Sequence, residues 1–264
     1  MNIEQDDEFA INYDQHDYLK DLPVEQKKIS GDKYRILTEL EQRDFRGIVG
    51  KLNWIASRTD PTISFDVCQL STKLQQATVA DYHYSMKVTQ KAKNEKILRY
   101  GTLQPPVFLL AYSDASYANL PDGSSQGGYI VFLADNQGNI SPITWASRKL
   151  RRVCRSTITA ETMAMLDTID LCVWLFSMFK EVLDIELSTS IVKTDNKSSY
   201  DAINSTTAVE EKRLRVDIAA IRECVRNKEI SVQWVPKEDQ LADVLTKQGA
   251  DSTKLVKVLC QRHL

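Results

Sequence analysis

The chain has 264 residues, of which 42% are hydrophobic and 27% charged, as is usual for a globular protein with a buried core. Lys and Arg (34) nearly balance Asp and Glu (36), so the net charge of −2 excludes a general attraction to nucleic acids or acidic membranes. The low counts of Gly (9) and Pro (7) exclude collagen-like and low-complexity chains, and any polyanion must bind to a local basic patch.

The first hundred residues are predicted to be mainly helical. The polar, mixed sequence of residues 1–40 predicts short strands or loops. After it, apolar residues recur at three- and four-residue spacing, and the pair Asp60-Pro61 interrupts the pattern. This spacing predicts three amphipathic helices, over residues 39–57, 62–76 and 81–99.

Two consecutive prolines, Pro105 and Pro106, form the clearest linker, because they end a helix and favour extended backbone. After them we expect strands over 107–113, 127–134, 140–147, 189–195 and 230–235, and helices over 156–183, 196–204, 211–227 and 239–247. This order predicts a mixed α/β domain. We therefore divide the chain into a helical region (1–104), an α/β domain (105–250) and a C-terminal tail (251–264).

Four acidic residues interrupt apolar segments. Asp114 and Asp195 each end a predicted strand, and Asp243 lies in the last short helix. Glu161 falls on the apolar stripe of the long helix, where an unpaired charge is expensive to bury. Each residue also has an ordinary explanation, as a turn residue, a helix cap or a solvated surface acid.

Considered together, the four acids point to a metal site. If the strands that end at Asp114 and Asp195 are neighbours, three carboxylates converge at one edge of the sheet, and cations must neutralise them. Oxygen ligands without Cys or His suit Mg²⁺ or Mn²⁺. Two such ions can activate a water and stabilise the leaving oxygen of a phosphodiester, which is nuclease chemistry.

Residues 147–155 form a basic segment that joins the third strand to the long helix and contains no acid. Its basic residues are Arg148, Lys149, Arg151, Arg152 and Arg155. Because the segment reaches the end of the helix that carries Glu161, phosphate contact is favoured over an ordinary solvated loop. The basic residues between 87 and 99 fit a solvated helix face slightly better than a nucleic-acid contact.

Motifs in a fixed order carry a family resemblance. They are YSDASYANLPDGSSQGGYIVFL, STITAETMAMLDTID, KTDNKSSYDAI and QWVPKEDQLADVLTK. In this order they resemble the ribonuclease H domain of copia-type retrotransposon Pol polyproteins. Upstream, FRGIVGKLNWIASRTDPTISFDVCQLS and residues 12–20 resemble the segment between the reverse transcriptase palm and that domain, so the resemblance covers residues 8–250.

The resemblance implies a ribonuclease H-like mixed sheet flanked by helices, after a mainly helical region like a thumb or connection. It implies an enzyme that cleaves the RNA strand of RNA–DNA hybrids during reverse transcription with two Mg²⁺ ions. The implied ligands are Asp114, Glu161, Asp195 and Asp243. Candidate backbone contacts to the hybrid are Ser124, Ser125, Gln126, Asn196, Lys197 and Ser198.

Two departures from the family pattern matter. The Tyr-x-Asp-Asp motif of the polymerase palm is absent, so we expect no polymerase activity and an upstream palm and fingers of the same polyprotein as a partner. The three histidines lie outside residues 235–242, where many ribonucleases H carry a mobile one. Without a palm to pack against, residues 40–75 are expected to expose apolar surface, with Phe45, Trp54, Ile55 and Phe65 as candidates.

Two other functions stay open at this point. The chain could be a catalytically inactive, truncated retroelement remnant that acts at most as a nucleic-acid-binding or scaffold protein, or an α/β domain with only surface acids.

The five cysteines contain no C-x-x-C pair, and the longest apolar run, 171–179, is far shorter than the ~20 residues that span a membrane. We therefore expect an intracellular protein, cytoplasmic in a virus-like particle or nuclear, without signal peptide or membrane partner.

Overall fold

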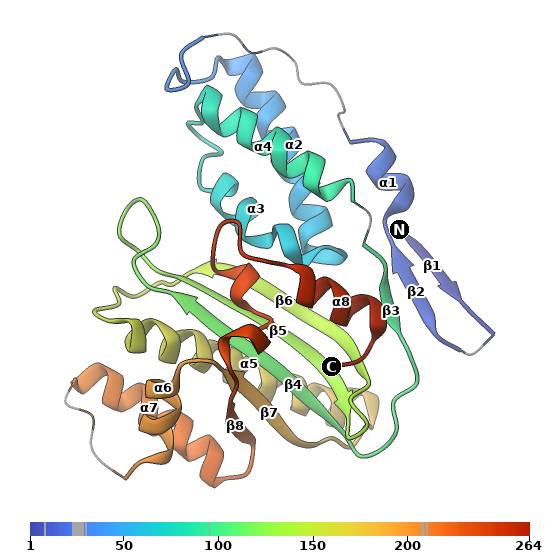
Figure 1. Ribbon diagram of the computed structural model, residues 1–264, viewed down its shortest axis with the longest axis vertical. Helices are drawn as coiled ribbons and strands as arrows, with labels where there is room; N and C mark the ends of the chain where they lie inside the picture. The colour runs from blue at the N-terminus through green and yellow to red at the C-terminus, as the bar shows by residue number, and fades with distance from the viewer. Residues whose placement is uncertain (8, 23–28, 30, 95, 207–208, 210) are drawn as a thin grey trace. The chain divides into compact units, whose positions relative to one another are not determined.

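The computed structural model describes residues 1–7, 9–22, 29, 31–94, 96–206, 209 and 211–264. The chain forms two compact units, residues 1–99 and 100–264 (Figure 1). The candidate acids all belong to the second unit. Residues 251–264, expected to be a tail, contain a helix of this unit. At the end of this helix the carbonyl of Arg262 accepts from the backbone amide of Ile140.

The first unit has a small sheet and a group of helices. Its strands are β1 (Asn2–Gln5), β2 (Ile11–Asp14) and β3 (Leu98–Tyr100), in the order β1-β2-β3. Its helices are α1 (His16–Lys20), α2 (Glu39–Arg58), the 3-10 turn η1 (Pro61–Ile63), α3 (Ser64–Ser71) and α4 (Val79–Ala92). Capping boxes at Thr38 and Thr78 fix where α2 and α4 begin.

Two predictions for this unit are wrong. The helix expected over 81–99 ends at Ala92, and Leu98 is buried in a strand, because a run of basic residues was read as a continuing helix face. The expected exposed apolar surface is also absent at its candidates: Phe45, Ile55 and Phe65 are buried and Trp54 is half-buried. Phe45 and Ile55 belong to a core to which α1, α2, η1, α3 and α4 all contribute.

The second unit is built on a five-stranded mixed sheet in the order β6-β5-β4-β7-β8. The antiparallel strands are β4 (Val107–Ser116), β5 (Gln126–Asp135) and β6 (Ile140–Lys149). β7 (Ser188–Thr194) pairs parallel to β4, and β8 (Ile230–Trp234) pairs parallel to β7. The predicted mixed sheet is confirmed.

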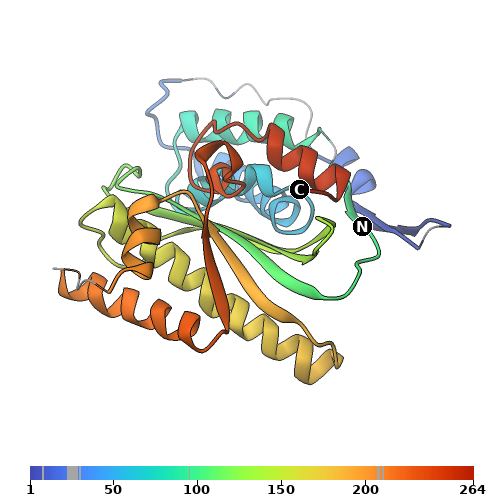
Figure 2. The ribbon, with the colours of Figure 1, turned by 60° about the horizontal axis from the view of Figure 1, so that its bottom comes forward.

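The helices of this unit are α5 (Thr157–Leu183), α6 (Lys197–Asn204), α7 (Lys212–Arg226) and α8 (Thr253–Gln261). Figure 2 shows α5 and α7 side by side along one face of the sheet. The helix expected over 239–247 is replaced by two 3-10 turns, η2 (Lys237–Asp239) and η3 (Asp243–Leu245). The backbone of Gln240 between them is extended, because its side chain bonds elsewhere in the fold.

Helix α5 is long and apolar enough to cross a membrane by length and composition alone. Half of its most apolar stretch is buried within the protein. Met165, Ile169 and Cys172 of α5 pack against Ala111 and Val192 of the sheet. Its hydropathy is therefore explained by core packing, and no other described helix passes the same test.

Candidate metal centre and active site

Three of the four predicted acids meet at one edge of the sheet. Strands β4 and β7 are parallel neighbours, so the end of β4 that carries Asp114 lies beside Asp195, which follows β7. Glu161 lies in the second turn of α5, which packs against β4. Each of these residues offers a carboxylate oxygen, and the three oxygens lie within 4.8 Å of one another.

Two of the three carboxylates are almost fully buried. Asp114 is 1% exposed and Glu161 is 5% exposed, whereas Asp195 is half-buried. The Oε2 atom of Glu161 is buried and has no hydrogen-bond partner among the described residues. A buried charged oxygen without a partner is costly, so the geometry leaves a place for a cation at Glu161.

The environment raises the pKa values of the two buried acids, Asp114 and Glu161, when no cation is bound. Burial raises the pKa of Glu161 well above its usual range, and the nearby Asp114 and Asp195 carboxylates raise it further. Burial also raises the pKa of Asp114 to about 6, although the Lys247 ammonium and the Thr246 hydroxyl act in the opposite direction. This is the pattern expected of like charges gathered in a low-dielectric site.

Asp243 lies outside the three-carboxylate group and is linked to it by a lysine. It begins η3, and its Oδ1 accepts a bond from the Lys247 ammonium. The same ammonium lies 3.5 Å from Asp114 Oδ2. The Thr246 hydroxyl donates to Asp114 Oδ2 as well. The role of Asp243 as a fourth ligand stays a prediction.

Two residues that the sequence did not single out hold Asp195. The Gln240 side-chain amide is 6% exposed and donates to the Ser113 carbonyl (2.9 Å) and to Asp195 Oδ1 (3.4 Å). The Trp234 indole N–H donates to the Asp195 carbonyl (3.0 Å). Their only signal in the sequence is their place in the segment that contains Asp243.

A glycine allows η3 to approach the sheet. Gly128 pairs with Asp114 across β4 and β5. A Cβ atom at Gly128 would lie 2.7 Å from Leu245 Cβ and 2.9 Å from Thr246 Cγ2. The missing side chain therefore lets Thr246 reach Asp114.

Comparison with known proteins finds relatives of this chain. The chain is 34% identical over 217 residues to the retrovirus-related Pol polyproteins from transposons RE2 and RE1 of Arabidopsis thaliana. The match covers 77% of this chain and 14% of each polyprotein. The chain is a homologue of retrotransposon Pol polyproteins. The transposon Ty1-JR2 Gag-Pol polyprotein of Saccharomyces cerevisiae is 27% identical over 223 residues, which are 79% of this chain and 12% of that protein.

The predicted resemblance to retrotransposon Pol is thereby confirmed, and no family model matches the chain. The chain spans only about one seventh of the length of these Pol relatives. Among solved structures, LC11-RNase H1 in complex with RNA/DNA hybrid is 16% identical, with a TM-score of 0.40, over 52% of this chain and 93% of that one. The foamy viral protease-reverse transcriptase in complex with RNA/DNA hybrid is 14% identical, with a TM-score of 0.44, over 89% of this chain and 28% of that one. These values say nothing about activity.

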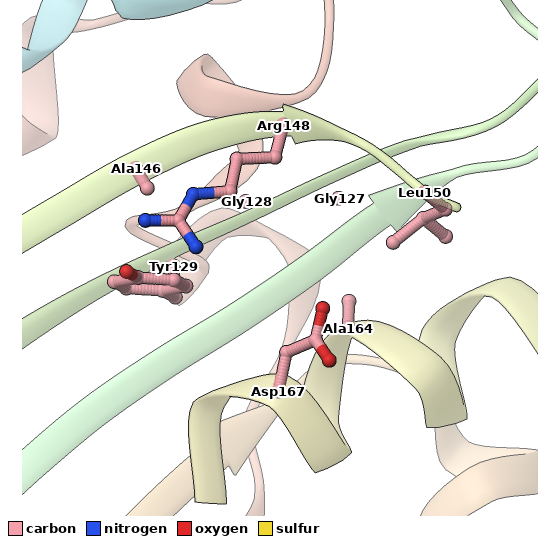
Figure 3. Close-up of a pocket in the computed structure, with 8 residues that line it drawn as sticks. All are labelled: Gly127, Gly128, Tyr129, Ala146, Arg148, Leu150, Ala164 and Asp167. Carbon is pink, nitrogen blue, oxygen red and sulfur yellow. The ribbon is translucent and has the colours of Figure 1, made fainter. Parts of the chain in front are cut away.

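In the basic segment, residues 147–155, two of the five basic side chains form ion pairs with aspartates. Arg152 forms an ion pair with Asp217 (2.6 Å), and Lys149 pairs with Asp122. Arg151 and Arg155 are exposed. Figure 3 shows the Arg148 guanidinium near Tyr129, 5.8 Å from the centre of its ring, in a small pocket that Ala164 and Asp167 of α5 also line.

The candidate backbone contacts differ in accessibility. Ser125 and Gln126 are buried: the Ser125 hydroxyl accepts from the backbone amide of Ala118, and the Gln126 amide donates to the Ser147 hydroxyl. Ser124 is half-buried and bonds to Asp122.

The candidates after β7 lie around the start of α6. Asn196 caps α6 by accepting from the backbone amide of Ser199. Lys197 and Ser198 are exposed beside Asp195, and the Lys197 ammonium lies 5.8 Å from the centre of the Trp234 ring. Their contacts to nucleic acid stay predictions.

Proposed function

We propose that the chain is a divalent-metal-dependent ribonuclease H of a copia-type retroelement, which cleaves the RNA strand of RNA–DNA hybrids during reverse transcription. The proposal rests on one observation above all. Three carboxylates from separate elements lie within 4.8 Å, and one of their oxygens is buried without a partner. The homology to Pol polyproteins supports the assignment to reverse transcription.

The ligand set fits Mg²⁺ or Mn²⁺. Asp114, Glu161 and Asp195 supply only carboxylate oxygens, which these hard ions prefer. In the proposed arrangement these three residues hold one ion, and Asp114 with Asp243 holds a second. The chemistry supplied at such a site is polarisation of the phosphodiester and activation of an attacking water.

Neighbouring residues keep the ligands in position. Thr246 orients the Asp114 carboxylate by donating to its Oδ2. Gln240 and Trp234 hold Asp195, one at its side chain and the other at its carbonyl. Such supporting bonds restrict the rotamers of metal ligands, and losing one commonly costs 10–100-fold in metal affinity or activity.

The exposed arginines Arg151 and Arg155 precede α5, which carries Glu161, and we assign them to phosphate contacts with the hybrid. We also propose that the upstream palm and fingers of the same polyprotein deliver the hybrid, so that polymerisation is carried out there and not by this chain.

The test is cleavage of a hybrid with end-labelled RNA. We expect the RNA strand alone to be cut, only with Mg²⁺ or Mn²⁺, and at least about 100-fold more slowly by Asp195→Asn. Asp170→Asn makes the same change at an exposed position of α5 and serves as the control. Equal cutting by the wild type and Asp195→Asn contradicts the proposal. Hybrid binding without any metal-dependent cutting supports an inactive remnant instead.

A further inference from the structure

A lysine ammonium occupies the space between two of the candidate ligands. Lys247 Nζ bonds to Asp243 Oδ1 and lies 3.5 Å from Asp114 Oδ2. The Lys247 side chain is 36% exposed, whereas the Asp114 side chain is 1% exposed. This is not an ordinary surface ion pair, because one partner is a buried carboxylate that also belongs to the proposed metal site.

The local fold fixes the lysine in this place. Lys247 follows Thr246, whose hydroxyl bonds to both the Asp114 carboxylate and the Asp243 carbonyl. Gly128 lets this part of the chain approach the backbone of β5 closely. The backbone on the N-terminal side of Lys247 is therefore fixed, and the contacts with Asp243 and Asp114 hold the ammonium itself.

Asp114 thus belongs to two groups of charges. With Glu161 and Asp195 it forms the three-carboxylate group, and with Asp243 it contacts the Lys247 ammonium. Two cations that share one carboxylate are the arrangement of a two-ion site. In this chain the Lys247 ammonium, a covalently attached monovalent cation, lies between Asp114 and Asp243.

We propose that Lys247 is the resident cation of the second position and competes there with a divalent ion; this inference rests on the proposed metal site. The substrate-free protein then binds one divalent ion, at Asp114, Glu161 and Asp195. A second ion binds only if it displaces the ammonium from Asp114 and Asp243. Lys247 therefore acts as a positioning residue that sets the number of bound ions.

The experiment counts ions on the metal-free full chain, without nucleic acid, by Mn²⁺ titration followed by electron paramagnetic resonance. Lys247→Met removes the charge and keeps most of the stem, and Lys247→Arg keeps the charge. Lys254→Met is the matched control, because Lys254 also forms an ion pair with an aspartate, Asp239, and is 49% exposed.

We expect one Mn²⁺ on the wild type, Lys247→Arg and Lys254→Met. For Lys247→Met we expect a second ion whose dissociation constant is at least about tenfold lower than the weak second binding of the wild type. If Lys247→Met does not fold, Lys247→Gln repeats the test. Equal stoichiometry and affinity for the wild type and Lys247→Met overturn the inference.

Failure of the inference differs from failure of the proposed function. Suppose that the wild type binds one Mn²⁺, that Asp195→Asn loses this ion and that Lys247→Met binds as the wild type does. The proposed metal site is then supported, and the proposed role of Lys247 is refuted. If the wild type binds no Mn²⁺ and cuts no hybrid, both the proposed function and the proposed role of Lys247 are refuted.

Discussion

Replacing Gly128 by Ala tests the close approach on which the site geometry depends. The new methyl carbon would lie 2.7 Å from Leu245 Cβ and 2.9 Å from Thr246 Cγ2. Leu245 Cβ is attached to the backbone, so relief requires η3 to move away from β5. Overpacking of this kind costs about 1–3 kcal/mol, while the better strand propensity of Ala returns about 0.5–1 kcal/mol. We expect a net loss of about 1–2 kcal/mol.

Movement of η3 also takes the Thr246 hydroxyl away from the Asp114 carboxylate that it orients, so hybrid cleavage should fall by about 10–100-fold. The assays are urea unfolding and cleavage of a labelled hybrid. Gly127→Ala is the control, because its new methyl meets the far end of the Leu150 side chain at 2.7 Å, which can rotate away, and lies 3.3 Å from Ala164 Cβ, a milder contact than those at Gly128. If Gly128→Ala is as stable and as active as the wild type, the close approach is not what positions Asp114.

Three further predictions concern charge and hydrogen bonding. Because burial raises the pKa values of Glu161 and Asp114 in the fold, the metal-free protein should lose stability as the pH rises above about 4, through about 6 for Asp114 and further for Glu161. Urea unfolding in a chelator at pH 5 and 7.5 measures this loss, which Glu161→Gln should reduce; a flat profile contradicts it. Gln240→Leu leaves the Ser113 carbonyl without its donor, so we expect a loss of about 1–3 kcal/mol in thermal unfolding and weaker cleavage. Arg151→Ala and Arg155→Ala should each lower the salt dependence of hybrid binding by about one unit of slope, measured by fluorescence anisotropy; unchanged slopes exclude both from phosphate contact.

The periodicity of the sequence predicts the acids that meet at the sheet edge. Glu161 interrupts an apolar stripe with a period of 3.6 residues, and Asp114 and Asp195 end apolar strands. These are local signals, and the register of β4 with β7 turns them into one group. Pairing of the two strands was the single assumption that the sequence required.

Sequence periodicity does not predict the supporting residues Gln240 and Thr246, because their contacts are long-range. Gln240 reaches Ser113 across 127 positions of the chain, and Thr246 reaches Asp114 across 132. A helix over 239–247 was expected from the apolar spacing, but the side-chain amide of Gln240 accepts from the backbone amide of Ala242 and holds an extended residue between two turns. The same side chain donates to the Ser113 carbonyl, so a tertiary hydrogen bond and a local one together override helix propensity here.

The apolar residues of α2 show the same limit for the first unit. Phe45 and Ile55 were expected to need an absent palm because the resemblance assigned them to a region that normally contacts one. The structure gives them partners from the same unit, including Leu52 and Met86. Apolar periodicity predicts that a face is buried, but it does not say against what.

The site joins stability and function through one short segment. Asp243, Thr246 and Lys247 lie within five consecutive residues. Thr246 and Lys247 contact Asp114 directly, and Asp243 contacts the Lys247 ammonium. Because they share that partner, the effects of substitutions at Gly128 and Lys247 on metal binding should not add. The segment 243–247 brings the Lys247 ammonium to the buried Asp114 carboxylate and also packs against Gly128 of β5. Displacing this segment would therefore separate both the Thr246 hydroxyl and the Lys247 ammonium from Asp114.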